Sequence, residues 1–254
     1  MKTTLITGAS SGIGLEFARI FAGQNYNLVL VARSKEKLQE LKKELEKLKI
    51  QVTVIVADLS KKETPQKIKD ALKKEKIKID ILVNNAGFGD LKEFKDSDLK
   101  KMEDMIQVNI TSLTALTHLF MQDIISNKGG ILNVGSVAGF IPGPKMAVYY
   151  ATKAYVISFS EAIAKELEKD EVTVSVLCPG PVKTGFAKAA DIDGDAVVKG
   201  KIPSAREVAE FGYKMFKKGK VVAVHGLKMR ALKNTVRLLP RKTVVNIVSK
   251  MQEL

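Results

Sequence analysis

Apolar and polar residues alternate between two kinds of segment along the whole chain of 254 residues. Segments of the first kind are short, nearly uninterrupted apolar runs, which are typical of strands buried on both faces of a parallel sheet. Segments of the second kind are longer, and their apolar residues recur every three or four positions, as in amphipathic helices. The alternation predicts an α/β fold with a doubly wound parallel sheet of about seven strands, helices on both faces and right-handed crossovers. The predicted strands are 3–7, 26–32, 52–57, 79–83, 131–134, 172–177 and 221–224.

Capping residues and breaks in the apolar pattern place the ends of several predicted helices. The first helix should end near Gly23, and the last helix before residue 221 should end at Gly219. Capping boxes of the form S-x-x-E, at 60–63 and 204–207, predict two helix starts. A long periodic region over 96–121 should be divided near Asn109, a polar residue in an apolar stretch. The pattern shows no linker and no internal repeat beyond the βα unit.

A glycine-rich turn, TGASSGIG at residues 7–14, follows the first predicted strand and opens the first predicted helix. Glycines let the backbone approach a pyrophosphate closely, and a helix N-terminus supplies free N–H groups and the positive end of a dipole. Strand, turn and helix together predict a dinucleotide cradle of the Rossmann type. The cofactor-binding residues expected in this turn are Gly8, Ser10, Ser11, Gly12, Ile13 and Gly14.

The end of the second predicted strand indicates which dinucleotide the cradle prefers. In a Rossmann fold an acidic residue near this place holds the ribose 2′-OH of NAD. This chain has no carboxylate there and has Arg33 instead, whose guanidinium matches a phosphate in charge and geometry. We therefore expect NADP(H) rather than NAD(H). Asp58, just past the third strand, either holds the adenine amino group or serves as an N-cap or turn residue.

Three chemically active side chains follow the fifth predicted strand. Ser136 lies at the end of that strand, and Tyr149 and Lys153 share one face of the next helix because they are four residues apart. A cation beside a phenol favours the phenolate, so Lys153 should lower the pKa of Tyr149 and allow acid–base chemistry near neutral pH. The loop Asn85, Ala86 and Gly87 ends the fourth strand at the same sheet edge, where a doubly wound sheet binds its ligands, so we expect it to contact the cofactor; a plain turn is the alternative.

Composition changes this picture little. The formal net charge is +14 and the pI about 9.6. Most lysines, however, lie in helical stretches where they alternate with glutamates, so we do not expect nucleic acid as a partner. The one cysteine, Cys178, fits a small buried residue in a reducing compartment. No apolar stretch approaches the ~18–20 residues of a membrane span. We expect a cytoplasmic protein.

The C-terminal residues 228–254 form a basic amphipathic extension that Pro240 divides into two segments. Such a segment can pack on its own domain, cover the active site, contact a sister subunit or lie on an anionic membrane. Packing on the protein is the interpretation we favour, because soluble helices are routinely amphipathic. Residues 186–202 lack periodicity and are expected to form a lid that, with Phe140 and the extension, builds the substrate pocket.

The motifs together resemble the short-chain dehydrogenase/reductase family over nearly the whole chain. They are TGASSGIG at 7–14, Asp58, NNAG at 84–87, Asn109, Ser136, YxxxK at 149–153 and PGPVKT at 179–184. The resemblance implies a catalytic tetrad of Asn109, Ser136, Tyr149 and Lys153, with Tyr149 and Lys153 also at the cofactor and no metal. It further implies cofactor contacts from Pro179, Gly180, Val182 and Thr184, and a homodimer or homotetramer.

The resulting hypothesis is an NADP(H)-dependent oxidoreductase that interconverts a ketone or aldehyde and an alcohol by hydride transfer. Its substrate would be a hydrophobic carbonyl or 3-oxoacyl compound. The alternatives are a non-catalytic dinucleotide-binding scaffold and a reductase of lipid-linked substrates at a membrane surface. A scaffold would not need the four tetrad side chains, all of which are present.

Overall fold

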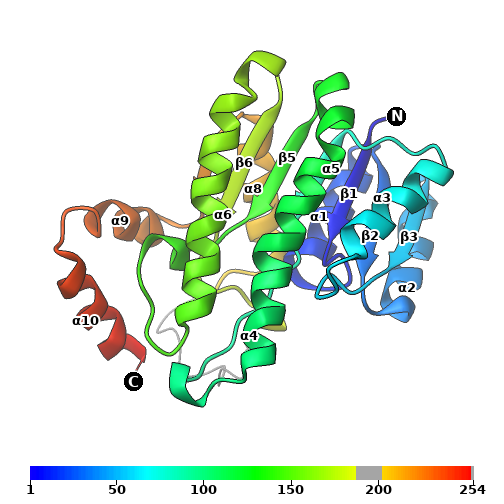
Figure 1. Cartoon of the computed structure of the whole chain (residues 1–254). Coiled ribbons are helices and arrows are strands. Elements are labelled where there is room, and N and C mark those ends of the chain that lie inside the picture. The colour runs from blue at the N-terminus through cyan, green and yellow to red at the C-terminus, as the bar shows by residue number, and fades with distance from the viewer. Residues whose placement is uncertain (187–201, 253–254) are drawn as a thin grey trace.

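The computed structural model describes residues 1–186 and 202–252 of the chain. Seven strands form one parallel sheet in the order β3-β2-β1-β4-β5-β6-β7 (Figure 1). The order reverses between β1 and β4, and in such sheets ligands bind at the carboxyl ends of the strands on either side of this point. The doubly wound sheet expected from the sequence is therefore confirmed. The strands are β1 (Thr3–Thr7), β2 (Asn27–Ala32), β3 (Val52–Val56), β4 (Ile81–Asn84), β5 (Gly130–Val134), β6 (Thr173–Cys178) and β7 (Val222–Val224).

Successive strand residues point to opposite faces of the sheet, and each face has its own apolar core. In β1, Ile6 packs in the core beneath three helices, α1 (Gly12–Gly23), α2 (Lys35–Leu45) and α8 (Ala205–Lys217). Its neighbour Leu5 packs in the opposite core, beneath α3 (Thr64–Lys74), α5 (Leu113–Ser126) and α6 (Ala147–Glu166). Figure 1 shows α5 and α6 in front of the sheet and α1 and α8 behind it.

A change of helix type divides the long helical region, as the sequence predicts. The α-helix α4 (Leu99–Ile106) passes into a π-helical segment (Gln107–Ser112), and α5 continues from Leu113. Wider turns of this kind are rare and often occur at functional sites. Here the segment contains Asn109, which is almost completely buried.

The two predicted capping boxes have different outcomes. Ser204 and Glu207 form a complete box at the start of α8, which confirms that prediction. The prediction at 60–63 is wrong, because Glu63 is the N-cap of α3 and makes no side-chain capping hydrogen bond. The Ser60 N–H instead donates a hydrogen bond to Asp58 Oδ1 at 3.0 Å, so the Asp58 carboxylate stabilises this turn.

The C-terminal part of the chain forms two helices, α9 (Leu227–Thr235) and α10 (Arg241–Gln252), on either side of Pro240. Near the start of α9, Arg230 Nε donates a hydrogen bond to the carbonyl of Val224 in β7 at 3.0 Å. In α10, Val244 and Val248 are buried. Figure 1 shows both helices at one side of the molecule, next to the end of the sheet that carries β6. Among the described helices, none has the length and apolarity required to cross a bilayer.

Candidate active site

The glycine-rich turn (residues 7–14) joins β1 to α1 at the carboxyl edge of the sheet. Gly8 and Gly12 have φ values of +66° and +56°, in the left-handed region that favours glycine. A Cβ on Gly14 would lie 2.3 Å from Asn85 Nδ2 and 2.4 Å from the Gly8 carbonyl oxygen, so no side chain fits there. Ser11 is the N-cap of α1 and makes no side-chain capping hydrogen bond. The first N–H groups of α1 are therefore left for a ligand.

Asn85 holds the glycine-rich turn in place from the loop after β4. Its Nδ2 donates to the carbonyls of Thr7 at 2.9 Å and Gly8 at 3.3 Å. Thr7 Oγ1 in turn accepts hydrogen bonds from the N–H groups of Asn85 and Ala86, both at 3.0 Å. The structure thus assigns the Asn85 amide to the support of the cradle. The sequence interpretation missed Thr7, whose role depends on the neighbouring strand β4.

Ser136, Tyr149 and Lys153 converge beside this cradle and all three are buried. Ser136 Oγ accepts a hydrogen bond from the Ala138 N–H at 3.1 Å and lies near enough to the Tyr149 phenol to act on its pKa. Lys153 Nζ donates to the Val134 carbonyl, at the end of β5, at 2.8 Å. The same Nζ lies 5.8 Å from the centroid of the Tyr149 ring. The helix therefore directs both side chains to one place, as the four-residue spacing predicts.

Burial, rather than mutual attraction, dominates the acid–base properties of this pair. Burial raises the pKa of the Tyr149 phenol to about 12, although the Ser136 hydroxyl acts in the opposite direction. It also lowers the pKa of the Lys153 ammonium to about 8. The expectation that Lys153 lowers the pKa of Tyr149 is thus wrong for this structure, because desolvation disfavours the charged form of each group. At neutral pH the phenol therefore keeps its proton.

Asn109 supports the same place from the π-helical segment. Its Nδ2 donates to the Phe88 carbonyl and to Thr152 Oγ1, both at 3.0 Å, and its Oδ1 accepts from the Phe88 N–H at 3.2 Å. A Cβ on Gly87 would lie 3.0 Å from Asn109 Oδ1 and 3.4 Å from Lys153 Nζ. Because Gly87 has no side chain, the space next to Asn109 Oδ1 and Lys153 Nζ is not filled by it. Asn109 Oδ1 also keeps a lone pair that can accept a further hydrogen bond.

Arg33 and Asp58 lie together at the ends of β2 and β3. The Arg33 side chain is exposed. Burial acts to raise the pKa of the Asp58 carboxyl, but hydrogen bonds from Ser60 and the charge of Arg33 outweigh it and lower this pKa. The carbonyl of Asp58 also accepts a hydrogen bond from Thr64 Oγ1 at 2.7 Å. Of the two roles considered for Asp58, the turn role is confirmed, and the adenine contact stays a prediction.

The loop after β6 lies beside both the cradle and the catalytic candidates. The Pro179 carbonyl accepts a hydrogen bond from Ser136 Oγ at 3.4 Å. The Thr184 methyl would lie 3.3 Å from a Cβ on Gly12. This loop therefore connects the glycine-rich turn to the catalytic candidates. Of its other predicted residues, Gly180 lies against Met229 of α9, and Val182 packs against the α1–α8 core.

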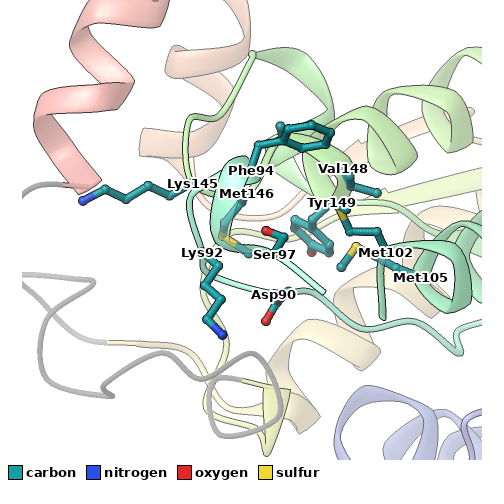
Figure 2. A pocket seen from close by; sticks show the side chains of 11 residues that line it. Asp90, Lys92, Phe94, Ser97, Met102, Met105, Lys145, Met146, Val148 and Tyr149 are labelled. Atoms are coloured by element: carbon teal, nitrogen blue, oxygen red, sulfur yellow. The ribbon is translucent and has the colours of Figure 1, made fainter. Parts of the chain in front are cut away.

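An apolar wall covers the Tyr149 ring. The Phe186 ring lies 5.4 Å from it, and a Cβ on Gly89 would lie 3.0–3.2 Å from Phe186, Met146 and Tyr149. Figure 2 shows the shallow pocket on one side of this wall, with Met102, Met105 and Met146 near Tyr149. Gly89 and Met146 were missed in the sequence, where nothing distinguishes them from other loop residues. Except for Phe186 and Ile202, the predicted lid over 186–202 lies outside the described residues.

Two further predicted residues pack away from this wall. Phe140 belongs to the core near α9, where Lys233 Nζ lies 5.9 Å from its ring centroid. Cys178 is fully buried, as expected for a small apolar residue, and burial raises its thiol pKa to about 12. Within the described residues, no three or more His, Cys, Asp or Glu side chains gather in a way that could hold a metal ion.

The cradle fits a nicotinamide dinucleotide. The glycine backbone leaves no room for side chains where a pyrophosphate would approach, and the first turn of α1 has no side-chain cap. Over residues 2–194 the chain matches the short chain dehydrogenase family. It belongs to this family. Members are oxidoreductases that bind a nicotinamide dinucleotide and act on small molecules, so the resemblance inferred from the sequence is confirmed.

Known proteins similar to this family member differ in substrate and cofactor. A very-long-chain 3-oxoacyl-CoA reductase of Kluyveromyces lactis is 32% identical over 193 residues, which are 72% of this chain and 56% of the relative. The chain thus spans little more than half of that relative's length. A Sphingobium yanoikuyae short-chain dehydrogenase in complex with NADPH is 32% identical, with a TM-score of 0.84 and coverage of 93% and 94%. A Burkholderia phymatum family member in complex with NAD is 26% identical, with a TM-score of 0.81 and 92% of each chain covered.

Proposed function

We propose that the protein is an NADP(H)-dependent oxidoreductase that reduces a ketone or aldehyde to an alcohol, with Asn109, Ser136, Tyr149 and Lys153 as its tetrad. The observation that carries this proposal is the buried convergence of Ser136, Tyr149 and Lys153 beside the glycine-rich turn. A dinucleotide-binding scaffold would gain nothing from burying an ionisable lysine at this place, since burial disfavours its charged form.

Each side chain has a separate task in this proposal. The nicotinamide cofactor supplies the hydride when it is bound. Ser136 Oγ orients the carbonyl oxygen, and Tyr149 donates its proton to that oxygen. A phenol with a pKa of about 12 keeps its proton at neutral pH but gives it up to an alkoxide, which is more basic. This favours the reductive direction.

Lys153 and Asn109 return a proton to Tyr149 after each turnover. Lys153 uses one of its three N–H donors on the Val134 carbonyl; the other two have no partner among residues 1–186 and 202–252 and are available to the ribose of the cofactor or to water. The free lone pair of Asn109 Oδ1 is available to a water that passes a proton to Lys153. Replacing Ser136 by Ala should leave NADPH binding intact and reduce turnover at least ~10-fold, because one orienting hydrogen bond to the carbonyl is lost. Equal turnover would contradict its role.

The preference for NADP(H) rests on Arg33, which is exposed just after β2, at the position where NAD-binding Rossmann folds have an acidic residue. Relatives of known structure bind either NADPH or NAD, so the preference has to be measured on this chain. Fluorescence titration should give tighter binding of NADPH than of NADH, and Arg33→Ala should close the gap. Lys47→Ala, an exposed charge on another part of the surface, serves as the control. Equal affinities of the wild type for both cofactors would refute the assignment.

The proposed substrate is a hydrophobic carbonyl compound, such as a 3-oxoacyl thioester. The methionine and phenylalanine side chains around Tyr149 support an apolar substrate, and the name of the Kluyveromyces lactis relative supports the 3-oxoacyl class. NADPH oxidation should be measured with 3-oxoacyl thioesters of increasing chain length and with small polar aldehydes. We expect kcat/KM to rise with chain length. A preference for small polar aldehydes would reject this substrate class but not the reaction.

We also propose that the protein is a cytoplasmic homodimer or homotetramer that associates through α5 and α6. Tyr155 and Phe159 of α6 stack at 5.7 Å and are only partly buried, and Tyr155 also hydrogen-bonds Thr114 of α5 at 2.9 Å. Such an ordered aromatic surface suits a subunit contact. Light scattering coupled to size-exclusion chromatography should give two or four subunits for the wild type and a smaller assembly for Tyr155→Glu. A monomeric wild type would contradict the proposal.

A further inference from the structure

The positive charge of the chain is concentrated in its C-terminal part. Residues 211–252 contain eleven lysines and arginines and no aspartate or glutamate, so they carry eleven of the fourteen net positive charges. The expected balance between lysines and glutamates is present in α2, where three glutamates accompany four lysines, but it does not extend to this segment. The segment has no carboxylate of its own to pair with these cations, so its exposed basic side chains attract anions.

Residues 237–242, here called the 237–242 turn, join α9 to α10 and include the first two residues of α10. They combine this charge with exposed apolar side chains. Their sequence is RLLPRK, and Arg237, Arg241 and Lys242 are all exposed. Leu238 between them is 86% exposed, and Leu227 at the start of α9 is 81% exposed. These two are the most exposed large apolar side chains in the part of the chain that the structure describes. Their exposure to water is unfavourable unless another apolar phase covers them.

The opposite side of the same helices already has its partners in the protein. Met229 of α9 lies against Gly180, and Lys233 lies above the ring of Phe140. In α10 the buried residues are Val244 and Val248. This inner side confirms the expected packing of the extension on its own chain. The outer side, with the 237–242 turn, remains exposed.

We propose that the 237–242 turn, with the exposed side of α9 and α10, binds the surface of an anionic lipid bilayer. Lysines and arginines near such a surface are attracted to its phosphates, while aliphatic side chains enter the boundary of the acyl chains. Nucleic acid fits less well, because α9, α10 and the turn contain no aromatic residue on which a base could stack. The proposal rests on residues outside the catalytic site and is independent of the reaction.

Co-sedimentation of the full chain with vesicles tests this directly. Vesicles of equal parts phosphatidylcholine and phosphatidylglycerol should carry the protein into the pellet, and pure phosphatidylcholine should not. Raising the salt concentration should weaken the binding, since these charges are exposed. Because each cation contributes about 5-fold to the partition coefficient, the triple variant Arg237→Glu, Arg241→Glu, Lys242→Glu should lose ~100-fold or more. Leu238→Ser should weaken binding several-fold.

Matched variants separate this surface from the overall charge. Lys43→Glu, Lys47→Glu and Lys74→Glu change the net charge by the same amount on exposed positions of other elements, and Leu48→Ser removes another exposed leucine. These controls should bind like the wild type, and NADPH binding should be equal in all variants. Equal loss in the control triple variant would overturn the proposal, as would a wild type that stays in the supernatant. If residues 237–242 were protected from hydrogen exchange in a lipid-free dimer, the surface would bind a second copy of the chain instead. If nucleic acid displaced the protein from the vesicles, the surface would be a nucleic-acid site.

Discussion

Replacing Lys153 by Met should make the protein more stable while it abolishes turnover. Lys153 is buried in α6, and within the described residues its ammonium makes one hydrogen bond, to the Val134 carbonyl at 2.8 Å. Burial lowers the pKa of this group from 10.5 to about 8, which means that the folded protein holds the charged form at a cost. Methionine has a similar length and flexibility and needs no water around its end, so it removes that cost.

The size of the effect follows from the shift in pKa. The lowering of this pKa from 10.5 to about 8 corresponds to about 3 kcal/mol that the charged lysine subtracts from the free energy of unfolding at neutral pH. The variant also loses a hydrogen bond and leaves a buried carbonyl without its donor, which costs roughly 1–2 kcal/mol. The net gain should therefore be about 1–2 kcal/mol. For a chain of this length, that corresponds to an increase in Tm of roughly 3–6 °C.

The pH dependence gives the sharper test. Below pH 8 both the folded and the unfolded wild type carry the proton on Lys153, and the full penalty is present. Between about 8 and 10.5 the folded protein loses this proton while the unfolded chain keeps it, so wild-type stability rises relative to the variant and the penalty disappears. Thermal and urea unfolding should be measured from pH 7 to 10.5, with Lys165→Met, an exposed lysine of the same helix, as the control. A Lys153→Met variant less stable than the wild type at pH 7, with a constant difference at every pH, would refute this reasoning.

Three other changes test further parts of the site. Gly14→Ala should abolish NADPH binding in fluorescence titration and destabilise the protein by several kcal/mol, because its Cβ would lie 2.3 Å from Asn85 Nδ2; a variant that binds NADPH like the wild type would count against the cradle. The rate of carbonyl reduction should fall as the pH rises through about 8, where Lys153 loses its proton, and a flat profile from pH 6 to 10 would contradict its part in proton supply. Phe186→Ala should open the wall over Tyr149 and lower kcat/KM for long apolar substrates more than for short ones; equal losses would remove Phe186 from the substrate site.

The sequence predicts best what depends on local pattern. The seven strands are visible as apolar runs because a parallel sheet buries both of its faces. The division of the long helical region near Asn109 and the break at Pro240 also depend on single residues in a regular pattern, and both are confirmed. Helix ends follow the pattern less closely: the first helix does end near Gly23, but Gly23 is its last residue rather than its cap, and Asn25 takes the left-handed conformation.

Features that depend on distant parts of the chain could not be predicted. The spacing of Tyr149 and Lys153 places them on one helix face, but their pKa values depend on burial by residues far away in the sequence, such as Phe186. The capping box at 60–63 has the right residues, yet Asp58 competes successfully for the Ser60 N–H. Likewise, the support that Asn85 gives to the glycine-rich turn requires β4 to lie beside β1.

The central claim is that Tyr149 donates the proton during carbonyl reduction, and Tyr149→Phe tests it most directly. NADPH oxidation with a 3-oxoacyl thioester and NADPH binding should be measured side by side for the wild type and this variant. The account predicts that turnover falls by at least ~100-fold, as expected for the loss of a general acid, while NADPH binds with unchanged affinity. Turnover that stays within a few-fold of the wild type, with NADPH bound equally well, would contradict the account.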